Sequence, residues 1–257
     1  MTQHTLVLIP IYRPVLDRRE TASVDQSMAV LRSTGRPCVF IGPEGMDTGW
    51  YAERYPDVPV MRFPARFFSS IKGYNLLMLD PDFYRGFAGH DFVLILQTDA
   101  FLLHDALDHW AARPYDYIGA PWPEGMEVLV STDRFAGPHA RKVRARVGNG
   151  GLSLRRIDKC VALLQEFPQS LEVFRHTGSS EDLFFGLLGP LSLDFVMPGE
   201  VEASCFAMEL QPPHYFHVNG QREPMGAHAW WKYDPAFWVS RVPSLAHALN
   251  EPTAAAV

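Results

Sequence analysis

The stretch DFVLIL at residues 91–96 runs directly into Gln97, Thr98 and Asp99, and this junction decides the fold. A short apolar run bounded by turn residues is typical of a buried strand. In open α/β sheets, ligands bind outside the carboxyl ends of the strands. Asp99 is therefore a candidate ligand for Mg²⁺ or Mn²⁺ held against a diphosphate. The structural alternative is a turn aspartate that caps the next segment.

Upstream of this strand, the chain has the order strand, helix, strand. Residues 5–11 (TLVLIPI) form a near-continuous apolar run, which is typical of a strand in a parallel sheet. A helix is predicted next by apolar residues at spacings of four and three, which are Val24, Met28 and Leu31. Gly35 stands where a helix C-cap would, and residues 37–42 (PCVFIG) form another short apolar strand. This order is the start of a βαβ unit and predicts an α/β fold.

Downstream, short apolar segments continue the pattern. We expect a strand at residues 116–122 and helices within 75–79, 105–112, 157–164 and 181–187. The alternation in KVRARV predicts a half-buried strand whose basic face carries Lys142, Arg144 and Arg146. That face is either solvated or lines an anionic pocket. After residue 200, Pro, His and aromatic residues with weak periodicity predict loops that close over a site.

No linker-like segment interrupts the chain. We therefore expect a single α/β domain over residues 1–250, followed by a disordered tail at 251–257 (EPTAAAV).

Composition excludes several classes of protein. The 257 residues are 47% apolar and 20% charged, which is incompatible with a disordered chain. Lys plus Arg is 23 against 29 for Asp plus Glu, a net charge of −6, so a nucleic-acid binder is not expected. Three cysteines without C-x-x-C spacing favour a reducing compartment. With neither a signal-like start nor an apolar run of ~18 residues, we expect a cytoplasmic protein without a transmembrane segment.

The turn GNGG at residues 148–151 is a candidate binding loop. Its glycines permit positive φ and let another molecule approach the backbone closely. Asn149 offers both a donor and an acceptor to a sugar hydroxyl. The turn lacks the G-K-[ST] of a phosphate-binding Walker A loop. A tight hairpin turn remains the structural alternative.

Glu181 and Asp182 form an acidic pair after Ser180, a plausible helix N-cap. Acids in the first helical turn are stabilised by the helix dipole, which is a full structural explanation. The functional alternative is that one of them is a general base aimed at an acceptor hydroxyl.

His228, in GAHAWWKY, can ligate a metal through its neutral imidazole or can be a core histidine beside core tryptophans. The adjacent tryptophans can stack on a sugar ring. Lys72 can pair with a phosphate or be simply exposed. A G-x-S-x-G elbow and a catalytic-type cysteine context are both missing, so serine and cysteine hydrolases are not expected.

Five motifs in order carry a resemblance that covers about residues 66 to 235: LILQTDAFLL, DYIGAPW, VGNGGLSLRR, SSEDLFF and GAHAWWKY. Together they resemble a family of bacterial glycosyltransferase-like proteins long catalogued as a domain of unknown function and associated with polysaccharide and lipopolysaccharide assembly. They resemble, more distantly, GT-A glycosyltransferases of the fringe and β-galactosyltransferase type. The resemblance implies a GT-A-like, Rossmann-type mixed sheet flanked by helices.

The resemblance implies metal and donor residues. Enzymes of this type hold Mn²⁺ or Mg²⁺ with a D-x-D motif, and Asp99 matches its last acid while Gln97 replaces its first. A later histidine completes the metal shell in those enzymes, and His228 is the match. The first strand fits the nucleotide-binding start of the fold, which assigns Pro10 and Tyr12 to the donor, together with Lys72.

The resemblance also implies catalytic and acceptor residues. In inverting members the second residue of an acidic pair is the base, which corresponds to Asp182 with Glu181 as its neighbour. The glycine turn that lines the acceptor and donor sugars corresponds to Asn149, Gly150 and Gly151. Trp122 and Trp230 are the expected sugar platforms.

The combined prediction is a glycosyltransferase that moves a sugar from a nucleotide-diphosphate donor to a hydroxyl of a glycan or other acceptor. One alternative is a non-catalytic carbohydrate-binding protein of the same ancestry, favoured by Gln97 in place of the first acid. Another is a sugar nucleotidyltransferase. That class usually carries a glycine-rich loop after the first strand, whereas residues 9–20 (IPIYRPVLDRRE) contain no glycine.

Overall fold

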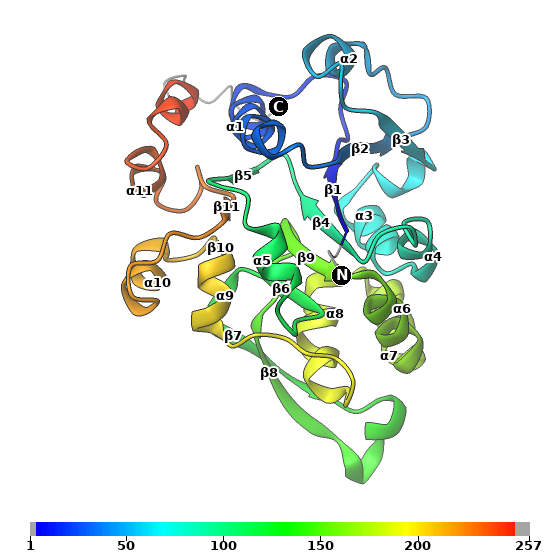
Figure 1. Ribbon diagram of the computed structural model, residues 1–257. Coiled ribbons are helices and arrows are strands. Elements are labelled where there is room, and N and C mark those ends of the chain that lie inside the picture. The colour runs from blue at the N-terminus through cyan, green and yellow to red at the C-terminus, as the bar shows by residue number, and fades with distance from the viewer. Residues whose placement is uncertain (1–3, 250–257) are drawn as a thin grey trace, which may run out of the picture.

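The computed structural model describes residues 4–249, and its centre is a six-stranded mixed sheet flanked by helices (Figure 1). The strand order is β3-β2-β1-β4-β9-β6. The strands are β1 (Thr5–Pro10), β2 (Cys38–Pro43), β3 (Val60–Phe63), β4 (Phe92–Leu96), β6 (Tyr117–Gly119) and β9 (Leu152–Arg156). Strands β1 to β4 are parallel, and β9 is antiparallel to both of its neighbours. The α/β fold and its mixed sheet are thus confirmed.

The predicted strand–helix–strand start is present. Helix α1 (Arg18–Thr34) begins at Asp17, whose carboxylate accepts hydrogen bonds from backbone N–H groups while Glu20 caps in return. It ends at Gly35, which has φ 66° in the left-handed region. Its buried face carries Val24, Met28 and Leu31, in agreement with the predicted period.

Both faces of the sheet are covered, which explains why β1 and β4 are continuous apolar runs. Alternate residues of β4 point to opposite cores: Leu94 packs on the α1 side and Ile95 on the other. The α1 side also holds α2 (Gly49–Arg54), α5 (Leu107–Ala111) and α9 (Glu200–Phe206). The other side holds α3 (Ile71–Met78), α4 (Pro81–Arg85), α6 (Ile157–Glu166), α7 (Pro168–Thr177) and α8 (Glu181–Leu188). Short 3-10 turns lie at Ala65–Phe67, Asp133–Phe135, Gly137–His139 and Gly189–Leu191.

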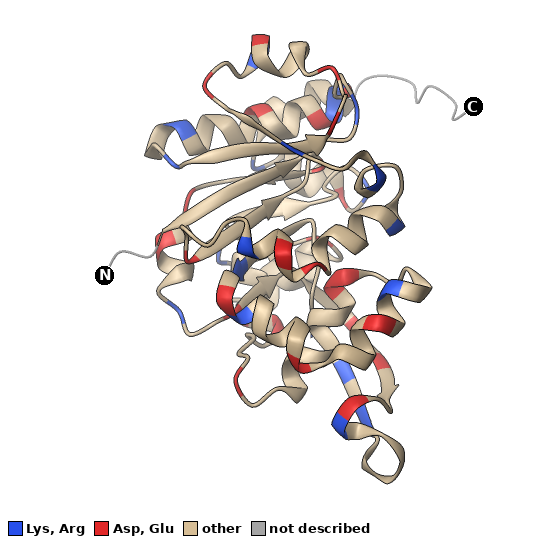
Figure 2. Ribbon diagram, turned by 90° about the vertical axis from the view of Figure 1, so that its right-hand side faces the viewer, with Lys and Arg blue, Asp and Glu red and all other residues tan. Residues whose placement is uncertain are grey.

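A two-stranded antiparallel ribbon, β7 (Pro121–Val130) with β8 (Arg141–Val147), projects from the body (Figure 1). The predicted alternation of β8 is confirmed by its burial pattern. Its basic side chains pair with surface acids: Lys142 and Arg144 with Glu127, and Arg146 with Glu200. Basic and acidic residues, blue and red in Figure 2, are likewise interspersed along the ribbon. The basic face is solvated and does not line the main cavity.

The prediction that residues after 200 form loops is wrong, but this segment does border the cavity, which Glu209, His228, Trp231 and Lys232 help to line. This segment adds β10 (Ala207–Met208), α10 (Pro212–Val218), β11 (Gly226–His228), α11 (Pro235–Val239) and a 3-10 stretch at Pro243–Leu249. Strands β10 and β11 form a second sheet with β5 (Ala100–Leu102). Trp230 and Trp238 pack on Phe101 in a third core. Elements this short span too few residues for a period to show.

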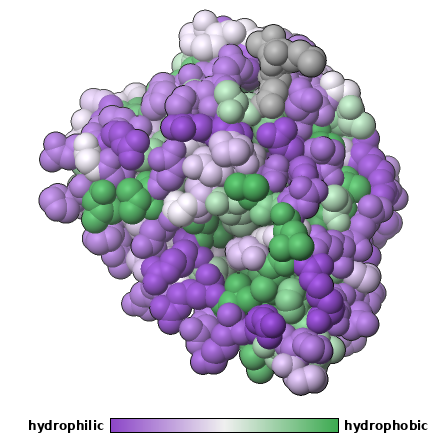
Figure 3. Space-filling model, turned by 60° about the horizontal axis from the view of Figure 1, so that its bottom comes forward, coloured by the Kyte–Doolittle hydropathy of each residue, from purple (hydrophilic) through white to green (hydrophobic). Residues whose placement is uncertain are grey.

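Two predictions concerned the C-terminal tail and membrane-spanning segments. The tail at 251–257 falls outside the described residues. Within 4–249, no helix has the length and apolar character needed to cross a membrane. Exposed apolar side chains of the described part include Leu129, Leu193 and Val196. On the face turned forward in Figure 3, apolar side chains gather toward the middle within a mostly hydrophilic surround.

Candidate active site

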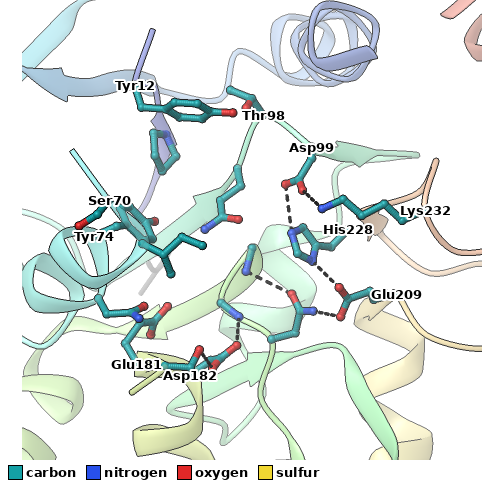
Figure 4. A pocket seen from close by; sticks show the side chains of 18 of the residues that line it. Tyr12, Ser70, Tyr74, Thr98, Asp99, Glu181, Asp182, Glu209, His228 and Lys232 are labelled. Carbon is teal, nitrogen blue, oxygen red and sulfur yellow. Dashed lines mark hydrogen bonds and ion pairs between the residues drawn. The ribbon is translucent and has the colours of Figure 1, made fainter. Parts of the chain in front are cut away.

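The main cavity has a volume of ≈ 830 Å³ and lies at the carboxyl ends of β1 and β4. This is the position at which open α/β sheets bind ligands. Its wall is built from segments far apart in the chain, and Figure 4 shows their side chains converging. The predicted residues in its lining are Pro10, Tyr12, Gln97, Asp99, Trp122, Asn149, Gly150, Gly151, Glu181, Asp182 and His228.

One wall of the cavity is a charged cluster around His228. Its Nε2 lies 3.0 Å from Asp99 Oδ1, and its Nδ1 lies 3.1 Å from Glu209 Oε1. Lys232 Nζ lies 3.4 Å from the other oxygen of Asp99. Asp99 follows β4 and His228 ends β11, and the backbone N–H of Ala229 donates to the Asp99 carbonyl at 2.9 Å. That backbone bond fixes the two segments side by side.

The electrostatics of this wall depend on its mixed charges. Burial alone lowers the pKa of His228, but the hydrogen bonds to Asp99 and Glu209 and their charges reverse this and raise the pKa to about 10. Burial raises the pKa of Asp99, yet His228 and Lys232 outweigh it and hold that pKa below its usual value. The raised pKa of His228 and the lowered pKa of Asp99 both favour an ion pair between these two side chains.

Glu209 was missed by the sequence analysis. Its carboxylate accepts hydrogen bonds from the Asn149 amide and from His228, residues 60 and 19 positions away. Asn149 has φ 52° and accepts from the Gly151 N–H at 3.1 Å, so its side chain closes the turn on itself. Nothing local in the sequence marks Glu209, because its partners meet it only in the folded chain.

Asp99 and His228 are the two side chains of this wall that could hold a divalent cation. His228 Nε2 and Asp99 Oδ1 share a hydrogen bond at 3.0 Å. A cation held by both would have to displace the proton between them, because only a neutral imidazole nitrogen can bind a metal. A carboxylate on the far nitrogen, here Glu209, is the usual support for a metal-binding histidine. Within 4–249, no three His, Cys, Asp or Glu side chains converge to hold an ion. The remaining ligands would therefore have to come from substrate phosphate and water.

The acidic pair occupies the opposite wall, and its members differ. Glu181 is buried, and its Oε1 accepts from the fully buried Arg155 guanidinium at 3.0 Å. Asp182 faces the cavity, where Oδ2 accepts from the Gly150 N–H at 3.0 Å and Oδ1 from the Ser180 hydroxyl at 2.6 Å. These two hydrogen bonds hold the Asp182 carboxylate in one orientation.

The glycine turn touches both walls. A Cβ at Gly150 would lie 2.2 Å from Glu181 Oε1, and one at Gly151 would lie 2.2 Å from His228 Nε2. Both positions therefore need glycine because side chains from the two walls press on the backbone. Residues 148–151 therefore form a tight turn, and three of them also line the cavity.

A third cluster closes the β1 side. Glu20 is buried and accepts hydrogen bonds from the hydroxyls of Tyr12 at 2.6 Å and Thr98 at 2.9 Å. Arg13 NH2 lies 2.6 Å from the second Glu20 oxygen. Tyr12 lines the cavity and is 51% exposed, and the Arg13 guanidinium carbon lies over its ring, 5.0 Å from the ring centre.

Two predicted site residues do not line the cavity. Trp230 is fully buried and its indole N–H donates to the Ser23 hydroxyl at 2.8 Å, so its assignment as a sugar platform is wrong. Ala229 has φ 48°, which turns the chain so that Trp231 lines the cavity instead. Lys72 lies outside the lining, and its amine donates to the His176 carbonyl at 3.0 Å.

Comparison with solved structures defines the class of fold. The galactosyltransferase LgtC, in complex with donor and acceptor sugar analogues, matches with TM-score 0.53 and 13% identity over 96% of this chain and 98% of its own. A glycosyltransferase involved in glycosylation of the major capsid of PBCV-1 matches with TM-score 0.52 and 8% identity, over 95% and 98%. The protein has the GT-A glycosyltransferase fold.

The family follows from the sequence. The profile described as "Protein of unknown function (DUF5672)" matches residues 57–228, which is most of the chain, so the protein belongs to this family. The search of curated proteins found no match to this chain. The matched span ends at His228 and contains Asp99, the glycine turn and the acidic pair.

Proposed function

We propose that the protein is a nucleotide-sugar-dependent glycosyltransferase that uses an inverting mechanism. The observation that carries this proposal is the placement of the Asp99–His228 cluster and Asp182 on facing walls of one cavity (Figure 4). The first offers charges suited to a diphosphate, and the second offers a carboxylate to an incoming hydroxyl. The fold shared with glycosyltransferases supports the same reading.

The donor diphosphate is assigned to the Asp99 side. Asp99 and His228 would hold Mn²⁺ or Mg²⁺, which when bound supplies positive charge to the leaving diphosphate. The Lys232 ammonium, exposed at the rim of the same cavity, is placed to contact a phosphate oxygen. The Tyr12 ring, which lines the cavity and carries the Arg13 guanidinium over it, offers a stacking surface to the base of the nucleotide.

The acceptor is assigned to the Asp182 side. The acceptor hydroxyl attacks the anomeric carbon, its oxygen forms the new glycosidic bond, and its proton passes to Asp182. The bond from the anomeric carbon to the diphosphate oxygen breaks, and the nucleoside diphosphate leaves with the electron pair. Glu181 does not compete for this proton, because its carboxylate is buried and paired with Arg155. Direct attack from the face opposite the leaving group inverts the anomeric centre.

The test is release of nucleoside diphosphate from a panel of UDP-, GDP-, CDP- and TDP-sugars in Mn²⁺, with mono- and oligosaccharides as acceptors. Asp182→Asn keeps the shape but cannot take the proton, so release should fall by ~10²–10⁴-fold while nucleoside diphosphate binding is retained. Asp194→Asn, a change at a surface carboxylate that pairs with Lys159, is the matched control and should be silent.

Two results would contradict the proposal. One is normal turnover in Asp182→Asn, which would move the base elsewhere or indicate retention of configuration. The other is a wild-type protein that binds glycans without any dependence on metal or nucleotide, as expected of a non-catalytic carbohydrate-binding protein.

A further inference from the structure

The cavity lining on the side of Asp182 includes apolar side chains that solvent reaches. Ile71 is 84% exposed and Met126 is 48% exposed, and both line the cavity. Exposed apolar residues that are scattered singly need no explanation, but apolar residues gathered around a binding cavity mark a contact with a ligand. The half-buried apolar side chains of the same lining are Phe68, Trp122 and Leu183. We call these five residues the apolar rim.

Ile71 is held near Asp182 by the start of helix α3. Lys72, the next residue along this helix, donates from Nζ to the His176 carbonyl at 3.0 Å. That contact fixes the start of α3 against the segment that leads into α8, the helix that carries Asp182. Ser70, the residue before Ile71, accordingly lies on the Asp182 side of the cavity, away from His228 and Glu209 (Figure 4).

Met126 reaches the same side from the β7–β8 ribbon. It pairs with Ala145, which is 1% exposed, and side chains directly opposite each other in an antiparallel pair share a face. A Cβ at Gly186 of α8 would lie 3.2 Å from the Ala145 Cβ, so this face of the ribbon packs on α8. Met126 is nevertheless about half exposed, and it therefore lies where the packed face opens onto the cavity.

The chemistry of the apolar rim selects one kind of ligand group. Aliphatic side chains offer no strong partner to a sugar hydroxyl, and they gain free energy by covering apolar surface. The lysine and arginine side chains in the cavity lining are Lys232 and Arg13, which pair with Asp99 and Glu20 on the other walls. The apolar rim therefore suits an uncharged alkyl group better than a phosphate-bearing one.

We propose that the acceptor is an amphiphile, a sugar whose reactive hydroxyl reaches Asp182 and whose uncharged alkyl chain lies over Ile71 and Met126. This inference rests on the proposed function and names the class of its acceptor. The apolar rim then favours alkyl glycosides over free sugars, because each methylene group that leaves water strengthens binding by about 4-fold.

The experiment compares acceptors that differ only in the length of the alkyl chain. The probes are the methyl and n-octyl forms of β-D-glucoside, β-D-galactoside and α-D-mannoside, below the concentration at which micelles form. The donor is the UDP-, GDP-, CDP- or TDP-sugar from which wild type releases nucleoside diphosphate fastest in Mn²⁺. The measurements are kcat and KM for the acceptor, and the calorimetric affinity for the nucleoside diphosphate.

The proteins are wild type, Ile71→Ser, Met126→Ser and a matched control, Leu193→Ser. Leu193 is a fully exposed apolar residue outside the cavity lining, so the control removes the same kind of surface elsewhere. Ile71 and Met126 are exposed, and their replacement by serine should therefore leave the fold intact.

Wild type should show a KM at least ~10-fold lower for the octyl than for the methyl form of the preferred glycoside, which requires burial of only a few methylene groups. Ile71→Ser and Met126→Ser should each raise the octyl KM by ~3–10-fold. Both should leave kcat, the methyl KM and the nucleoside diphosphate affinity unchanged. Leu193→Ser should match wild type in every measurement.

Nucleoside diphosphate release that octyl glycosides support no better than methyl glycosides would overturn the inference and leave the proposed function standing. An octyl preference that survives in both Ile71→Ser and Met126→Ser, or that falls equally in Leu193→Ser, would also overturn it, because the alkyl chain would then bind elsewhere. If wild type releases no nucleoside diphosphate from any donor with any acceptor, both the inference and the proposed function fall.

Discussion

Two aspartate clusters flank the short strand β5 and put the same residue type to different uses. Asp99 precedes β5 and lies at the cavity, where His228 and Lys232 contact it and its side chain is 20% exposed. Asp105 follows β5 and lies beside Arg36, which precedes β2 at the other end of the sheet, and its side chain is 1% exposed. Asp99 lines the main cavity, whereas Asp105 lies behind Arg36 and lines neither that cavity nor the smaller one that Arg36 borders.

The partners explain the difference. Asp105 accepts hydrogen bonds from the Leu107 N–H at 2.9 Å, the Thr34 hydroxyl at 2.8 Å and Arg36 at 2.9 Å. Every one of these belongs to the folded framework, so the cluster is complete without a ligand. Asp99 has only the two side chains of a cavity wall, and a ligand can take their place. Of the two aspartates, the candidate functional one is Asp99, because a bound ligand could replace the side chains that contact it.

The largest effect is expected for Asp99→Asn. The substitution removes the carboxylate that is proposed to hold the metal ion together with His228. Release of nucleoside diphosphate in Mn²⁺ should therefore fall by at least ~100-fold, because mutating a residue that only supports a metal ligand already costs ~10–100-fold. The melting temperature should fall less than in Asp105→Asn, because the Asp99 side chain is 20% exposed and that of Asp105 is 1% exposed. Enzyme assay and thermal unfolding check the two halves, and a melting temperature that falls as far as in Asp105→Asn would make Asp99 a structural residue.

A smaller effect is expected for Glu209→Gln. The amide keeps the size of the side chain but weakens the support for His228 Nδ1 and leaves the Asn149 amide facing a changed partner. Mn²⁺ affinity in the presence of nucleoside diphosphate should drop ~10–100-fold, with the metal-free nucleotide affinity unchanged. Glu223→Gln, at a surface carboxylate paired with Arg241, is the matched control. Equal metal affinity in Glu209→Gln and wild type would remove Glu209 from the site.

The smallest effect on activity, and the reverse pattern, is expected for Asp105→Asn. It should cost about 1–3 kcal/mol of unfolding free energy near pH 7 and leave turnover intact. Burial alone raises the pKa of Asp105, but the Leu107 N–H, Arg36 and Thr34 lower it below its usual value. A carboxyl whose pKa is lower in the folded state stabilises above its unfolded pKa and loses that contribution as pH falls through the folded pKa.

The gap between Asp105→Asn and wild type should therefore narrow in acid. Denaturant unfolding from pH 7 downward measures it. A gap that stays constant or widens as the pH falls would contradict the assigned charge pairing.

Local sequence patterns predicted the site residues that lie at the ends of apolar strands and helices. Asp99 could be placed because β4 is an uninterrupted apolar run and its end is fixed by the sheet. Asp182 could be placed because Ser180 and the following apolar period mark the start of α8. The glycine turn was visible because close contacts with Glu181 and His228 demand glycine.

The remaining parts depend on long-range contacts. Trp230 packs on Phe101 whereas Trp231 lines the cavity. The positive φ of Ala229, just before them, is not indicated by any sequence period. Lys72 and Tyr74 share helix α3, yet Tyr74 faces the cavity and Lys72 caps the end of α7 through His176. A period tells which face of a helix is buried, but it does not tell which partner the other face meets.

Asp99 and His228 are proposed to receive a metal ion together with the donor diphosphate. This assignment is tested by titrating Mn²⁺ into the protein with and without saturating nucleoside diphosphate, comparing UDP, GDP, CDP and TDP. With only two protein ligands converging, Mn²⁺ should bind weakly alone and at least ~10-fold more tightly in the presence of the matching nucleoside diphosphate, by linkage between the two ligands. Nucleotide affinity should rise by the same factor in Mn²⁺. Manganese affinity that is the same with and without every nucleoside diphosphate, or is unchanged by Asp99→Asn, would contradict the account.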